Sequence, residues 1–145
     1  MSAKRQTPLP DPRPGDVLRY AYLWADEQEA GRDEGTEDRP CLVVVVRDSD
    51  AVKRVAIVPI TRSPQARDGV ELAAGVKARL GLDPGDPSWV VCSEYNQFVW
   101  PGPDLRPIPR TGAWLYGRLP DDLFLRVATA LRSAARRPRV VSRTS

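Results

Sequence analysis

Two aliphatic segments, residues 41–46 (CLVVVV) and 55–60 (VAIVPI), are separated by only eight residues. Their β-branched side chains favour strands, and the unbroken apolar run of the first is typical of a strand buried on both faces. Parallel neighbours need a crossover of about a dozen or more residues, so this short link requires an antiparallel hairpin. Asp48, Ser49 and Asp50 favour a turn between the segments. The chain is therefore predicted to be mostly β.

The remaining apolar segments are short and lie between turn-forming residues. We expect strands over residues 16–25, 69–72, 89–93 (continuing toward 99) and 114–116, with a short helix over 73–80. A longer helix is predicted from Pro120, a favoured first-turn residue, to Pro138, which ends it. Its apolar positions share one face and are Leu123, Val127, Leu131 and Ala134. Five to seven short antiparallel strands with a C-terminal α-helix indicate a small closed or half-closed barrel with the helix packed on it.

The length of 145 residues suits a single domain. Prolines alternate over residues 8–14, so residues 1–13 are expected to be an extended lead-in to a domain at 14–136, with a basic flexible tail at 137–145. No apolar run approaches the ~20 residues that span a bilayer. The basic N-terminus lacks the apolar core of a signal peptide. We therefore expect a cytoplasmic protein without membrane contact.

Histidine is absent from the sequence. Its absence excludes a Ser-His-Asp triad, an imidazole zinc site and a ribonuclease that uses a histidine pair. Cys41 and Cys92 each lie within an apolar run and are expected to be reduced and buried. The sequence contains no recognisable cluster of metal ligands, so neither a metal nor another cofactor is predicted.

Charge is distributed unevenly along the chain. Five arginines lie within residues 132–145 with no acid among them, and residues 26–38 hold seven acids against Arg32. Without those two segments the chain has 16 basic and 12 acidic residues, a net charge of +4. The arginine-rich end is expected to be a solubilising tail or a nonspecific phosphate contact.

Four short segments follow one another in an order and at a spacing shared with a known family. They are Gly15-Asp16-Val17, then Arg39-Pro40 leading into the strand at 41–46, then Val58-Pro59-Ile60-Thr61, and finally Val90-Val91-Cys92-Ser93-Glu94. A helix after Gly117-Arg118-Leu119 completes the set. Over about residues 14–133 the chain resembles the MazF/PemK toxins of type II toxin–antitoxin systems.

The resemblance implies an SH3-like barrel that forms a homodimer and is neutralised by a cognate antitoxin protein. It also implies an endoribonuclease that cleaves single-stranded RNA at short sequences without a metal. Cleavage in that family leaves a cyclic phosphate and a free 5′-hydroxyl. The alternative from another class is a non-catalytic toxin or binding module on the same barrel, either one that poisons a protein such as gyrase or one that binds RNA.

Arg39 and Thr61 match the catalytic arginine and threonine of the family by position. A 2′-hydroxyl that attacks the neighbouring phosphate builds negative charge on the phosphoryl oxygens, which a guanidinium stabilises at any accessible pH. A threonine hydroxyl at a strand end can bind the same oxygens. Structural roles are also open: Arg39 could form an ion pair with the neighbouring acids, and Thr61 could form a turn.

The general base is less well defined by the sequence. Some members of the family use a histidine or an arginine–aspartate pair, but here histidine is absent and Val91 precedes Cys92. Glu94 is the first candidate for a catalytic carboxylate, and Glu37, expected to bind substrate, is the second. Either would need a pKa near the working pH.

Three residues that follow Glu94 are predicted to bind substrate: Tyr95, Asn96 and Phe98. Aromatic rings and an amide stack on and recognise unpaired bases, which is how single-stranded RNA is usually bound. The same residues could equally form a core or dimer cluster. The acidic residues at 26–38 are expected either to cover the basic RNA groove in the free protein or to form a solvated loop.

Overall fold

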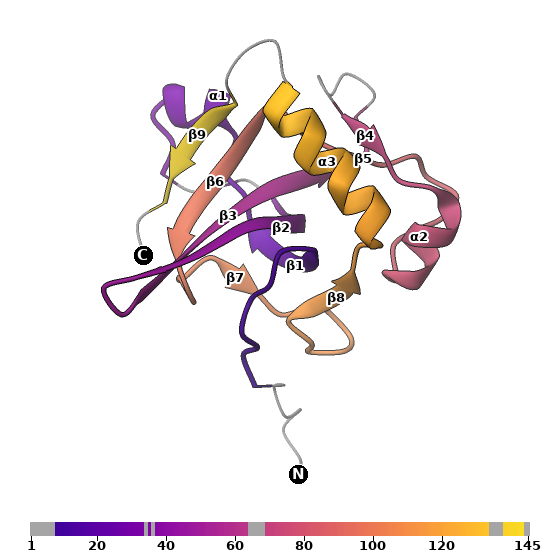
Figure 1. Ribbon diagram of the computed structural model, residues 1–145, viewed down its shortest axis with the longest axis horizontal. Coiled ribbons are helices and arrows are strands. Elements are labelled where there is room, and N and C mark those ends of the chain that lie inside the picture. The colour runs from indigo at the N-terminus through magenta and orange to yellow at the C-terminus, as the bar shows by residue number, and fades with distance from the viewer. Residues whose placement is uncertain (1–7, 34, 36, 64–68, 134–137, 144–145) are drawn as a thin grey trace.

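The predicted hairpin dominates the fold. The computed structural model describes residues 8–33, 35, 37–63, 69–133 and 138–143 (Figure 1). Strands β2 (Asp38–Ser49) and β3 (Val52–Thr61) pair antiparallel, which confirms the prediction and extends both segments. Asp50 and Ala51 have φ values of 52° and 62°, as in the type I′ turn whose twist matches that of the flanking strands.

The described part of the chain forms nine strands in one sheet. Strand β1 (Asp16–Ala21) pairs with β2, and β6 (Glu94–Val99) pairs with β3 on the other side. The shorter strands β7 (Leu105–Arg106) and β8 (Leu115–Arg118) pair with β1. Strand β5 (Trp89–Val90) joins the end of β3 to β4 (Val70–Glu71). All of these pairs are antiparallel, as expected.

The sheet follows the strand order β4-β5-β3-β2-β1-β7. No pairing among the described strands joins the two ends of this path into a closed barrel. The mostly β, antiparallel architecture with a helix in the C-terminal region is therefore confirmed, and the sheet itself is open.

The described residues also form three helices: α1 (Ala25–Glu29), α2 (Ala74–Arg79) and α3 (Asp121–Ser133). Helices α2 and α3 confirm the predictions, although Ala134 lies outside the described residues. The strand expected to continue to residue 25 ends at Ala21, and α1 follows. The Trp24 backbone N–H donates to Glu27 Oε1 at 3.0 Å, a contact that favours a helix start over further strand.

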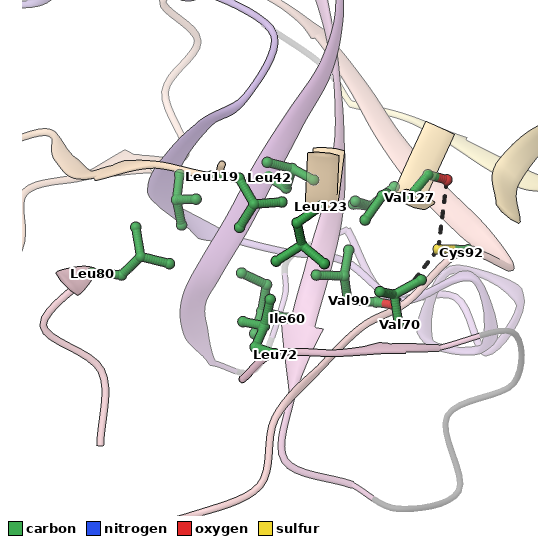
Figure 2. Close-up of a cluster of buried hydrophobic side chains, with 12 residues drawn as sticks. Leu42, Ile60, Val70, Leu72, Leu80, Val90, Cys92, Leu119, Leu123 and Val127 are labelled. Carbon is green, nitrogen blue, oxygen red and sulfur yellow. Dashed lines mark hydrogen bonds between the residues drawn. The ribbon is translucent and has the colours of Figure 1, made fainter. Parts of the chain in front are cut away.

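The core has two main parts. Leu123 and Val127 of α3 pack on Leu42, Ile60 and their neighbours in the sheet (Figure 2). A second cluster contains the aromatic residues Tyr20, Tyr22 and Phe98. Complete burial of one such side chain contributes about 1.5–3 kcal/mol to folding. Cys41 and Cys92 form no disulfide, and each is buried in one of these clusters, as predicted.

The C-terminal segment is folded, which contradicts the prediction of a flexible tail for residues 139–143. Strand β9 (Arg139–Ser142) pairs parallel with β6, and Val141 is buried against Leu23 and Ala25. Residue 137 and residues 144–145 lie outside the described residues. The prediction rested on the basic composition of this segment. It could not include the carboxylates and carbonyls that bind Arg139 and Arg143, because these come from distant segments.

None of the described helices combines the length and the apolar character that a membrane span requires.

Candidate functional site

A pocket of about 390 Å³ lies where β2 begins and β3 ends. The hairpin register pairs Cys41 with Pro59, so Arg39 and Thr61, each two residues further from the turn, reach the same end. Both line the pocket, together with Glu37. Two segments that are separate in the sequence thus bring three of the predicted site residues together.

Arg39 is held on two sides. Its Nη2 donates to Glu37 Oε2 at 3.1 Å, and its guanidinium carbon lies 5.0 Å from the centre of the Trp24 ring. The Arg39 side chain is 16% exposed, whereas that of Glu37 is 70% exposed. An ion pair with so exposed a partner contributes only about 0–1 kcal/mol, so another anion can displace Glu37. Arg39 Nε is buried without a hydrogen-bond partner among the described residues, so part of its donor capacity is unused.

Thr61 also forms a local contact. Its Oγ1 accepts a hydrogen bond from the Ser63 backbone N–H at 3.1 Å, which is the turn-forming role that the sequence left open. A hydroxyl that accepts one bond still has a hydrogen to donate. The geometry is therefore compatible with both roles of Thr61.

Glu94 lies away from this pocket. Its Oε1 accepts hydrogen bonds from Tyr22 Oη at 3.1 Å and from the Ala25 backbone N–H at 2.9 Å. Burial raises the pKa of the Glu94 carboxyl above its ordinary value. The structure does not bring Glu94 together with Arg39 and Thr61, and it uses this carboxylate to join β6 to the start of α1.

The predicted substrate-binding residues of β6 lie on both faces of the strand, because successive side chains point to opposite sides. Asn96 and Phe98 share one face, and Tyr95 lies on the other. Asn96 is fully buried, with its Oδ1 accepting from Leu23 N at 3.0 Å and its Nδ2 donating to Leu23 O at 2.7 Å. Phe98 is also buried and stacks on Tyr20 with ring centres 4.7 Å apart. Both belong to the core, one of the two alternatives that the sequence left open. Tyr95 is half-buried and lines a different groove.

Two pocket residues that sequence reasoning missed come from other strands. Arg19 of β1 and Tyr116 of β8 line the pocket, and Arg19 Nη1 donates to Tyr116 Oη at 3.0 Å. The sequence contained one signal for Arg19, which is a charged residue between apolar residues in the middle of a strand. Tyr116 had no such signal, since only the pairing of β1 with β8 brings it near.

The described residues of the acidic segment 26–38 do not form one cover over a basic groove. Asp26 and Glu29 of α1 both accept hydrogen bonds from Arg139 of β9, with Asp26 Oδ1 at 2.8 Å from Nη1. Glu37 and Asp38 line the pocket instead. The pocket is also not simply basic. Its charged lining residues are Arg19, Arg39 and Arg62 with Glu37, Asp38, Asp83 and Asp86.

Within the described ranges, no three His, Cys, Asp or Glu side chains are grouped as metal ligands. No protein-family model and no curated protein matches the chain.

Proposed function

We propose that this protein is a toxin of the MazF/PemK type and cleaves single-stranded RNA without a metal. The observation that carries the proposal is the shared pocket of Arg39 and Thr61, the two residues that match the catalytic pair of the family. The proposal includes an SH3-like fold for the open sheet, a homodimer, a cytoplasmic location and a cognate antitoxin whose flexible segment covers the pocket.

The proposed reaction is an internal transfer at phosphorus. The 2′-oxygen forms a bond to phosphorus, the bond from phosphorus to the 5′-oxygen breaks, and a cyclic phosphate and a 5′-hydroxyl result. Arg39 donates hydrogen bonds to the non-bridging oxygens as their charge grows, and the Thr61 hydroxyl donates a further one. A base takes the proton of the 2′-hydroxyl, and a proton is returned to the 5′-oxygen.

Glu37 is the proposed base. It is the carboxylate that already contacts Arg39, and its exposure leaves it accessible to a bound strand. Arg39 binds Glu37 in the free protein and the RNA phosphate in the complex. When the phosphate displaces Glu37, that carboxylate becomes available to the 2′-hydroxyl. Glu94 has no part in this scheme, since its carboxylate is held by Tyr22 and Ala25.

The contact between Arg39 and Glu37 also favours the second candidate, a non-catalytic toxin or RNA-binding module on the same fold. If that ion pair persists when RNA binds, the pocket holds RNA without cleaving it. The two candidates therefore differ in whether the Glu37 carboxylate is released from Arg39.

The deciding experiment incubates the purified protein with single-stranded RNA in excess EDTA and analyses the ends of the products. The proposal predicts cleavage to 2′,3′-cyclic phosphate and 5′-hydroxyl ends. Binding in a gel-shift assay without cleavage would favour the second candidate. Cleavage that appears only with added Mg²⁺ or Mn²⁺ would contradict the metal-independent reaction.

A further inference from the structure

A second groove, of about 660 Å³, lies between α3 and strands β2, β3 and β6. Figure 1 shows α3 crossing in front of this part of the sheet. Among the described residues, it shares no lining residue with the pocket of Arg39 and Thr61. The two are therefore separate sites, and a role for the second groove does not depend on the proposed function.

A β-bulge shapes the floor of the groove. Val43 pairs with Ile57 and Val45 pairs with Ala56, so Val44 is an extra residue in β2. A bulge redirects side chains that would otherwise alternate between faces. Here the two consecutive valines, Val44 and Val45, both line the groove, and Val45 is 40% exposed. Phe124 and Leu131 of α3 form the facing apolar wall.

Arginines surround this apolar floor. Arg47 and Arg54 lie directly opposite each other on the hairpin, where like charges are destabilising. Arg132 of α3 is the third, and all three are exposed. Across the described part of the chain, none of their side chains forms a hydrogen bond or ion pair, and no acidic residue lines the groove. The paired arginines weaken the free hairpin and are suited to an anionic partner.

We infer that this groove binds an acidic amphipathic segment of a partner protein. Apolar side chains of the segment contact Val45, Phe124 and Leu131, and its carboxylates bind Arg47, Arg54 and Arg132. A second copy of this chain is disfavoured, because a two-fold interface centred on this groove would bring two sets of the same three arginines into one contact area without an acidic residue among the described lining of the groove to offset them. RNA is disfavoured because unpaired bases stack on accessible aromatic rings, whereas the exposed apolar side chain here is Val45. The two aromatic residues that line the groove, Tyr95 and Phe124, are partly buried against the core.

The test begins with selection from a display library of random peptides of roughly 15 residues, a length at which an isolated helix becomes possible. An enriched peptide is then synthesised, and its affinity is measured by fluorescence polarisation for the wild type, Val45→Asp, Arg54→Glu and Arg79→Glu. Arg79 is an exposed arginine of α2 outside the groove, so its variant has the same charge change as Arg54→Glu.

The expected result is enrichment of peptides that combine several Asp or Glu residues with apolar residues on one face. Val45→Asp and Arg54→Glu should each weaken binding by about tenfold or more, whereas Arg79→Glu should leave the affinity unchanged. The inference is overturned if no peptide is enriched, if the enriched peptides lack acids, or if the Val45 and Arg54 variants bind as the wild type does.

Two further measurements distinguish the other occupants. Sedimentation that shows a dimer dissociated by Val45→Asp would assign the groove to a second copy and overturn the inference. If a short RNA competes with the peptide and the Arg54→Glu variant loses RNA binding, the groove is an RNA site. That result would also overturn the inference. RNA cleavage by Val45→Asp reports on the proposed function separately, because Val45 lies outside that pocket.

Discussion

The hydroxyl of Tyr22 donates a hydrogen bond of 3.1 Å to the buried carboxylate of Glu94, so a predicted catalytic acid is part of the core. The same carboxylate oxygen accepts the backbone N–H of Ala25. Glu94 therefore connects β6 to the segment that leads into α1. Its role in the fold can be separated from any role in catalysis, because it does not line the pocket of Arg39 and Thr61.

This burial makes stability depend on pH. Because the pKa of Glu94 is raised in the folded protein, its contribution to stability is fully present below the ordinary value near 4.5 and is lost as pH rises through the raised value. Glu94→Gln keeps an oxygen acceptor for Tyr22 and cannot ionise. The free energy of unfolding of the wild type, minus that of the variant, should decrease as pH rises above about 4.5. Urea unfolding at several pH values measures this difference, and a difference that does not change with pH would contradict the assignment.

Arg39→Ala should remove cleavage with little effect on folding. Loss of one donor to a developing oxyanion lowers the rate by ~10²–10³. The stability cost is small, since among the described residues the Arg39 side chain forms an ion pair with an exposed glutamate and a cation–π contact of about 0.5–1 kcal/mol. Single-turnover cleavage and thermal unfolding are measured in parallel, with Arg79→Ala as the matched control. An unfolded Arg39→Ala protein would instead show that Arg39 is a structural residue.

Thr61→Val tests the hydroxyl alone, because the two side chains have nearly the same shape. We expect a smaller loss of cleavage than for Arg39→Ala, together with loss of the bond from the Ser63 backbone N–H. Thr61→Ser retains the hydroxyl and serves as the control, since it should keep both the turn contact and the activity. If Thr61→Val cleaves RNA at the wild-type rate, Thr61 is only a turn residue.

Arg143→Ala should destabilise the fold strongly, although composition suggests a flexible end. Arg143 Nη2 donates to Asp104 Oδ2 at 2.9 Å, its Nη1 donates to Ala21 O at 2.8 Å, and the side chain is only 3% exposed. Breaking a buried pair costs about 3–5 kcal/mol, because one charge remains without its partner. Urea unfolding provides the measurement, and Arg132→Ala is the control, an exposed arginine that should change stability by less than ~0.5 kcal/mol. Equal stability of the two variants would mean that β9 adds little to the fold.

Local sequence determined the parts of this protein whose physical cause is local. The link between the two valine-rich segments is too short for anything but an antiparallel hairpin, and both strands formed. The apolar face of residues 123–131 specified α3 by its spacing. An antiparallel hairpin brings the start of its first strand to the end of its second, so the sequence implied that Arg39 and Thr61 lie at the same end. The bulge at Val44 shifts the register between the turn and this end, and only the structure showed it.

Only the tertiary structure decided the roles of Glu94, Asn96 and Phe98. Alternation along β6 shows that these three side chains share a face, but it cannot show whether that face meets the core or a ligand. Arg143 illustrates the same limit, because its partners Asp104 and Ala21 lie 39 and 122 residues away. A charged residue is solvated at the surface or buried in a network according to which distant groups the fold brings to it. Composition and spacing record the charge but not its partners, so the environment of each polar side chain was decided only when the strands assembled.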